Sequence, residues 1–133
     1  MPGELLVRSN FGDDQLHIWT TKPGGHWRAR IAFADLMAEG TVPERCSGEE
    51  LHLDAWFAEL AAEWRGWQGE KRYEALGLRL ASRHDGLGHV TLDVTLQDDY
   101  TADGRWRVRA SLMLDAGALD RLALEARELD RAL

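Results

Sequence analysis

The stretch from Leu53 to Gly69, LDAWFAELAAEWRGWQG, constrains the fold more than any other part of the chain. Its apolar residues recur at steps of three and four, which at about 100° per residue places them along one side of a helix. A stripe of this kind must face a hydrophobic core, so we expect an amphipathic helix here. The residues of the stripe are Leu53, Trp56, Phe57, Leu60, Trp64 and Trp67.

Both ends of this helix carry recognisable signals. Gly66 tolerates the left-handed conformation that often follows a helix, so we predict a positive φ at Gly66 and a helix that ends at Arg65. In such an ending, Trp67 folds back onto Ala61 or Ala62.

The start of the helix has two candidate caps. Ser47 followed by Glu50 fits a capping box, whereas Asp54 stands just before the densest apolar spacing. We therefore place the start between Glu49 and Asp54.

The residues before the helix alternate between apolar and polar, as strands do. A short apolar run, Leu5–Val7, precedes a turn-rich cluster, and Gln15–Thr20 with Trp27–Phe33 then alternate around a second turn. The segment Asp35–Glu39 shifts phase and fits a bulge, a continued strand or a short helical turn.

The residues after the helix show the same strand pattern and end in a second helix. Alternation runs over Leu76–Leu80, Val90–Leu96 and Trp106–Leu114, with short connections that contain Asp-Gly. Apolar residues in Ala116–Leu133 then return at steps of three and four behind a candidate N-cap, Asp115.

The predicted order is therefore βββ–α–βββ–α, in one domain that spans residues 1–133. One-sided strands and one-sided helices bury their apolar surfaces by stacking on each other. We expect an α+β fold with two layers, in which a twisted antiparallel sheet of five to seven strands carries both helices on one face. At 133 residues with 44% hydrophobic residues, the chain is large enough to bury its own core.

Composition narrows the cellular setting and the partners. The net charge of −7 opposes binding to nucleic acid and favours a basic partner. Apolar runs are far shorter than the roughly 20 residues that cross a bilayer. A single cysteine, Cys46, and the lack of a leader-like start predict a cytoplasmic protein.

Six tryptophans raise the question of stacking on a ligand, but their positions favour a structural role. Trp19 is out of phase with its strand, so we expect it near the surface or in a second core. The other five share the apolar phase of their elements and are predicted to lie in the core: Trp27, Trp56, Trp64, Trp67 and Trp106.

Few residues point to chemistry. His84, Asp85 and His89 include metal-ligand types, but Asp85-Gly86 is turn chemistry, so we predict a hairpin and no metal site. No complete catalytic constellation, phosphate loop or cofactor motif is present, and we predict neither catalysis nor a cofactor. The alternative is an enzyme or small-ligand domain with a pocket near Trp19, His84 and His89.

Acidic residues form the clearest candidate surface. The central helix and the segment Gln97–Gly104 have acids without a nearby base, and we predict that these acids dock a basic partner. They are Glu59, Glu63, Asp98, Asp99 and Asp103. The alternatives are a role in solubility, or pairing with the arginines of the last strands, namely Arg79, Arg105, Arg107 and Arg109.

Two motifs carry a resemblance to known proteins. Trp64–Lys71 (WRGWQGEK), with the helix residues Trp56–Leu60, and Asp85–Val90 (DGLGHV) resemble small bacterial domains of unknown function and the WapI-type immunity proteins of contact-dependent polymorphic toxin systems. The resemblance extends over Leu53–Leu133. It implies a cytoplasmic immunity protein, or antitoxin, that binds and blocks a cognate toxin. The expected function is thus non-catalytic protein binding.

Overall fold

The computed structural model describes residues 3–10, 12–20, 26–42, 52–98 and 105–131. Within these ranges, eight strands and two α-helices form in the order ββββ–α–ββββ–α, with a short 3₁₀ turn, η1, before the last helix. The elements are β1 (Glu4–Arg8), β2 (Gln15–Thr20), β3 (Trp27–Ala32), β4 (Met37–Val42), α1 (Leu53–Ala62), β5 (Lys71–Ala75), β6 (Leu78–His84), β7 (His89–Gln97), β8 (Arg107–Asp115), η1 (Ala116–Ala118) and α2 (Leu119–Arg131).

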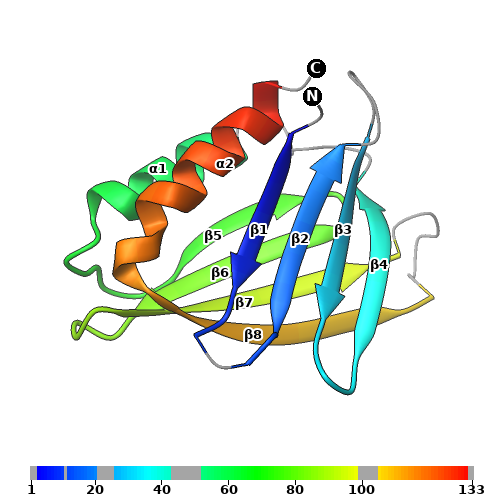
Figure 1. Cartoon of the computed structure of the whole chain (residues 1–133), viewed down its shortest axis with the longest axis horizontal. Coiled ribbons are helices and arrows are strands. Elements are labelled where there is room, and N and C mark those ends of the chain that lie inside the picture. The colour runs from blue at the N-terminus through cyan, green and yellow to red at the C-terminus, as the bar shows by residue number, and fades with distance from the viewer. Residues whose placement is uncertain (1–2, 11, 21–25, 43–51, 99–104, 132–133) are drawn as a thin grey trace.

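The strands form two antiparallel sheets of four, each in sequence order (Figure 1). Sheet A comprises β1 to β4, and sheet B comprises β5 to β8. Each strand pairs with the next strand in the chain, so both sheets are simple antiparallel meanders. The predicted α+β class, with antiparallel strands and packed helices, is confirmed.

Each half of the chain has one strand more than the alternation predicted, and the strands divide into two sheets. The segment Asp35–Glu39 contains the end of a tight turn, in which the Phe33 amide donates to the Leu36 carbonyl over 2.7 Å, followed by the start of β4. In β5, Tyr73 and Ala75 face inward between charged residues. A five-residue strand with two buried side chains gives too short a pattern to stand out from a polar segment.

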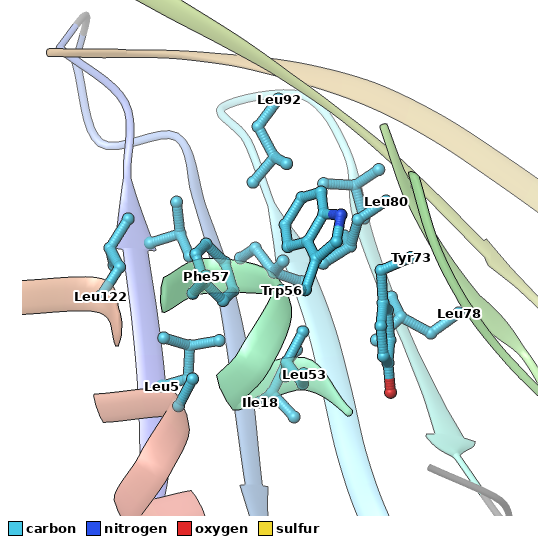
Figure 2. Close-up of a cluster of buried hydrophobic side chains, with 14 of the residues drawn as sticks. Leu5, Ile18, Leu53, Trp56, Phe57, Tyr73, Leu78, Leu80, Leu92 and Leu122 are labelled. Atoms are coloured by element: carbon cyan, nitrogen blue, oxygen red, sulfur yellow. The ribbon is translucent and has the colours of Figure 1, made fainter. Parts of the chain in front are cut away.

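The core lies where the inner faces of the sheets meet the apolar sides of the helices. Figure 2 shows Trp56 on the side of α1 that faces Leu80 and Tyr73 of sheet B, while Phe57 faces Leu5 and Leu122. Trp56 meets the Phe57 ring edge-on at 5.0 Å. Each sheet and each helix therefore contributes side chains to the same cluster.

Helix α1 begins within the predicted range and ends earlier than predicted. It starts at Leu53 behind His52, whereas Ser47 and Glu50 lie outside the described residues. Its last residue is Ala62. At the next residue the Glu63 amide divides its hydrogen bond between the Glu59 and Leu60 carbonyls, which is typical of a tightening helix end, and the backbone then leaves the helix. The prediction of Arg65 as the end is therefore wrong.

The turn after α1 contains the predicted positive φ. At Gly66, φ is 142°, a conformation that favours glycine. Trp67 is partly buried and contacts β6. Its indole Nε1 donates to the Ser82 carbonyl of β6 over 3.3 Å, and its ring meets His84 edge-on at 5.1 Å.

Helix α2 runs beside β1 and protects the free edge of sheet A (Figure 1). The Leu6 amide donates to the Glu125 carboxylate over 2.8 Å, and the Arg121 guanidinium donates to the Leu6 carbonyl over 3.3 Å. Arg121 and Glu125 also pair with each other, as expected from their spacing of four. An edge strand that is satisfied in this way does not offer its backbone to another chain.

The first turn of α1 is capped by a side chain from α2. The Asp54 amide donates to the Asp130 carboxylate over 2.8 Å. Partial burial of Asp130 raises its pKa to about 6, and the Asp54 carboxylate adds to this rise, while the hydrogen bond from the Asp54 amide opposes it.

We expect Asp130→Asn to make the protein more stable at pH 7 by about 1 kcal/mol, an amount discounted for the partial exposure of the group. The folded-state pKa exceeds the ordinary value of about 3.9, so the folded state binds the proton more tightly and the contribution of Asp130 to stability falls as pH rises through 6. Asparagine keeps the acceptor and carries no charge. Urea denaturation of both proteins at pH 4, 5, 6 and 7 should show a difference that grows between pH 4 and 7. If the difference in unfolding free energy between the two proteins were the same at every pH, the pKa of Asp130 would not be raised in the folded state.

Candidate functional site

The tryptophans divide between the core and the surface. Trp27 and Trp56 are fully buried, and Trp67 and Trp106 are partly buried against the core, as predicted. Trp64 is 52% exposed, so its predicted core position is wrong. The helix ends before Trp64, and the helical period no longer determines where this side chain points.

Trp19 lies on the outer face of sheet A, as its phase predicted. It is partly buried, its ring stacks on His17 at a centroid distance of 4.7 Å, and the Arg30 guanidinium covers it at 5.4 Å.

The exposed Trp64 belongs to a turn that is fastened to the β6–β7 hairpin. The Gly86 amide donates to His84 Nδ1 over 2.8 Å, so His84 Nε2 carries the proton and donates to the Trp64 carbonyl over 2.7 Å. A Cβ atom on Gly66 would lie 3.5 Å from the same imidazole. One histidine therefore links the end of α1 to the hairpin tip.

The hairpin tip is ordered by Asp85, as its turn chemistry predicted. The Asp85 carboxylate accepts the amides of Leu87 at 2.6 Å and His89 at 3.1 Å, and it contacts His89 Nδ1 at 2.9 Å. These bonds, led by the one from Leu87, lower the pKa of Asp85. The tip presents Leu87, which is 81% exposed.

We name the surface formed by Trp64, Arg65 and Leu87 the Trp64 patch. The Arg65 guanidinium covers the Trp64 ring at 5.2 Å. The turn after α1 and the β6–β7 hairpin lie at the same end of the molecule (Figure 1). Trp64 and Leu87 are thus both exposed, on two segments that the hydrogen bonds of His84 hold next to each other.

Two of the predicted docking acids adjoin this patch. Glu59 and Glu63 both reach Lys71 of β5, with N–O distances of 3.2 and 2.6 Å. These contacts, above all the hydrogen bond that Lys71 donates to Glu63, raise the pKa of Lys71. These acids were predicted to lack a base. The base comes from β5, which lies outside the helix in the sequence but beside it in the fold.

The other predicted acids do not join Glu59 and Glu63. Asp98 has a side chain that is only 4% exposed, and its carboxylate pairs with Arg105 at 2.7 Å. Along β7, Asp98 lies roughly 20 Å beyond the row of Lys71. Asp99 and Asp103 lie outside the described residues. Asp98 therefore pairs with an arginine of its own meander, Arg105, rather than standing without a base.

The alternative pocket near Trp19, His84 and His89 is not assembled. Trp19 lies on the outer face of sheet A, whereas both histidines flank the hairpin of sheet B. Among the described residues, no group of three or more His, Cys, Asp and Glu side chains is arranged to hold a metal ion.

Two residues of the Trp64 patch were not predicted from the sequence to be functional. Arg65 and Leu87 were assigned only to a helix end and a turn. A large apolar residue at the tip of a turn held by Asp-Gly is the signal that could have identified Leu87.

The fold defines a small α+β domain made of two antiparallel meanders and two helices. The chain belongs to a family of unknown function, DUF6228, whose model matches residues 19–132. No curated protein and no solved structure matches the chain. Within the described ranges, no helix has the length and apolar character needed to cross a membrane.

Proposed function

We propose that this chain is a non-catalytic protein-binding domain that docks a partner through the Trp64 patch. The observation that carries the proposal is the 52% exposed side chain of Trp64, on a turn fixed by the bond from His84 to its carbonyl. Trp and Arg are the residue types that most often dominate binding energy at protein interfaces. An aromatic side chain on a fixed backbone also loses little conformational entropy on binding.

The surroundings of the patch indicate the chemistry of the partner. Glu59 and Glu63 lie at the end of α1 that leads into Trp64, and Lys71 of β5 together with Arg65 of the patch balances their two charges. The whole chain carries −7. The complementary partner has an apolar pocket for Trp64 and a net positive charge, so that long-range attraction to the negative charge of the chain would speed association.

The finer proposal is that the partner is a cognate basic toxin, and that the chain acts in the cytoplasm as its immunity protein. It rests on the resemblance of Trp64–Lys71 and Asp85–Val90 to immunity proteins. These two segments are distant in the sequence, but they meet at the Trp64 patch through His84 and Gly86. Within these segments Trp64 has an exposed side chain that the packing of the turn does not explain, so a common partner is the simpler reason for its presence.

The test is co-expression of the chain with the products of neighbouring genes, followed by calorimetric titration of any complex. We expect Trp64→Ala to raise Kd at least about 30-fold, the effect of a strong interface residue. Leu124→Ala is the matched control, because Leu124 is 62% exposed on α2 outside the patch. It should leave Kd within about twofold, and neither change should lower stability by more than about 0.5 kcal/mol.

Equal binding by wild type and Trp64→Ala would remove the patch as the docking surface. The role of the acids is measured separately with Glu59→Gln/Glu63→Gln, which avoids placing new positive charges beside Lys71. Slower association with a weaker salt dependence is the expected result. If no neighbouring product binds, the immunity assignment fails.

A further inference from the structure

The outer face of sheet B contains a hollow that the proposed docking function does not use. It has a volume of about 220 Å³ and lies over the middle of the sheet. Arginines surround it in a chain whose overall charge is negative. The lining includes Arg72, Arg79, Arg107 and Arg109, with Ala81 and Thr95 between them.

The strand register places two of these arginines on either side of one hydroxyl group. Arg79 of β6 is opposite Thr95 of β7, and Thr95 is opposite Arg109 of β8. Neighbouring strands are about 4.8 Å apart, so the two arginine Cα atoms flank Thr95 at a separation of about 10 Å. Both side chains are long enough to meet above Thr95.

Arg79 and Arg109 differ from the other lining arginines in their side-chain partners. Among the described residues, neither guanidinium makes a hydrogen bond or an ion pair, although Glu74 is opposite Arg79 in the register. The other two lining arginines have partners: Arg72 pairs with Glu70 at 2.9 Å and Arg107 donates to Gln97 at 3.0 Å.

The Asp93 carboxylate, which also lines the hollow, already has two side-chain partners. It pairs with Arg83 at 3.2 Å and accepts a hydrogen bond from Ser111 at 2.6 Å. It therefore does not compete for Arg79 or Arg109.

We propose that Arg79, Thr95 and Arg109 form a binding site for the oxyanion group, phosphate or carboxylate, of a small ligand. Two guanidinium groups match the planar oxygen pairs of such a group, and the Thr95 hydroxyl donates a further hydrogen bond. Glu74 and Asp93 at the sides of the hollow repel the neighbouring phosphates of a nucleic-acid strand. The site accepts one anionic group rather than a polyanionic chain.

The experiment is an NMR titration of the ¹⁵N-labelled full chain with sodium phosphate and, in a second arm, with sodium succinate. Sodium chloride at the same ionic strength is the reference. We expect saturable shifts of the Thr95 amide and of the Nε–H signals of Arg79 and Arg109. The arm with the tighter binding identifies the phosphate or the carboxylate class.

The variants separate a site from general charge effects. Arg79→Gln and Arg109→Gln should each weaken binding about tenfold, since each removes charge-assisted hydrogen bonds, and the double variant should show no saturation. Arg127→Gln, which changes an exposed arginine of α2, should bind like the wild type. Identical shifts with chloride, or unchanged affinity in the double variant, would overturn the proposal, provided that amide dispersion shows a folded protein.

Discussion

Trp56→Ala is expected to lower the free energy of unfolding by roughly 3–5 kcal/mol, the range for removal of a large buried aromatic side chain. Trp56 is 1% exposed and contacts aromatic rings on both sides, Phe57 at 5.0 Å and Tyr73 at 6.3 Å. Its removal leaves a cavity between α1 and sheet B. Thermal and urea denaturation measure the loss, and the melting temperature should fall by roughly 10 °C or more.

The same substitution at Trp64 is the natural control, because Trp64 is 52% exposed. We expect that change to cost less than about 0.5 kcal/mol. If the alanine variant does not fold, Trp56→Phe can be measured instead. Because the indole Nε1 has no hydrogen-bond partner among the described residues, the loss of stability in Trp56→Phe reports only the smaller volume of the ring. A smaller loss for Trp56→Ala than for Trp64→Ala would contradict the placement of both side chains.

Gly3→Ala is expected to destabilise the protein by about 1–3 kcal/mol through overpacking. Gly3 is buried where the start of β1 passes α2, and a Cβ atom there would lie 2.6 Å from both the Glu128 carbonyl oxygen and the Leu129 Cα. Both atoms belong to the helix backbone, which cannot turn aside as a side chain does. Either the strand or the helix must therefore shift.

Gly117→Ala provides the matched comparison. A Cβ atom on Gly117 would meet no other atom within 4 Å, so the substitution should cause no loss of stability. Urea denaturation of the two variants beside the wild type gives the difference. Equal stability of the two alanine variants would show that β1 and α2 are not in close contact at Gly3.

The sequence by itself determined the elements whose patterns are local. Gln15–Thr20 alternates strictly and is β2 with the predicted bounds, and the spacing of three and four after Asp115 became α2. The out-of-phase position of Trp19 correctly predicted a place outside the main core. These patterns need only the geometry of a strand or a helix, in which side-chain direction follows from residue spacing.

The tertiary structure decided what depends on contacts between distant segments. Helix α1 stops at Ala62 and its following turn is fastened to His84, so Trp64 faces solvent although its spacing places it on the core stripe. Lys71 neutralises part of a helix face that looked unpaired, because β5 lies beside α1 in space.

The division into two sheets and the candidate anion site have the same origin. Arg79 and Arg109 are thirty residues apart, and only the register of β6, β7 and β8 brings them to the two sides of Thr95.

Short polar strands such as β5 carry too few apolar residues for a periodic signal. They gain stability from ladder hydrogen bonds and cross-strand contacts, which form only when the partner strand is in place.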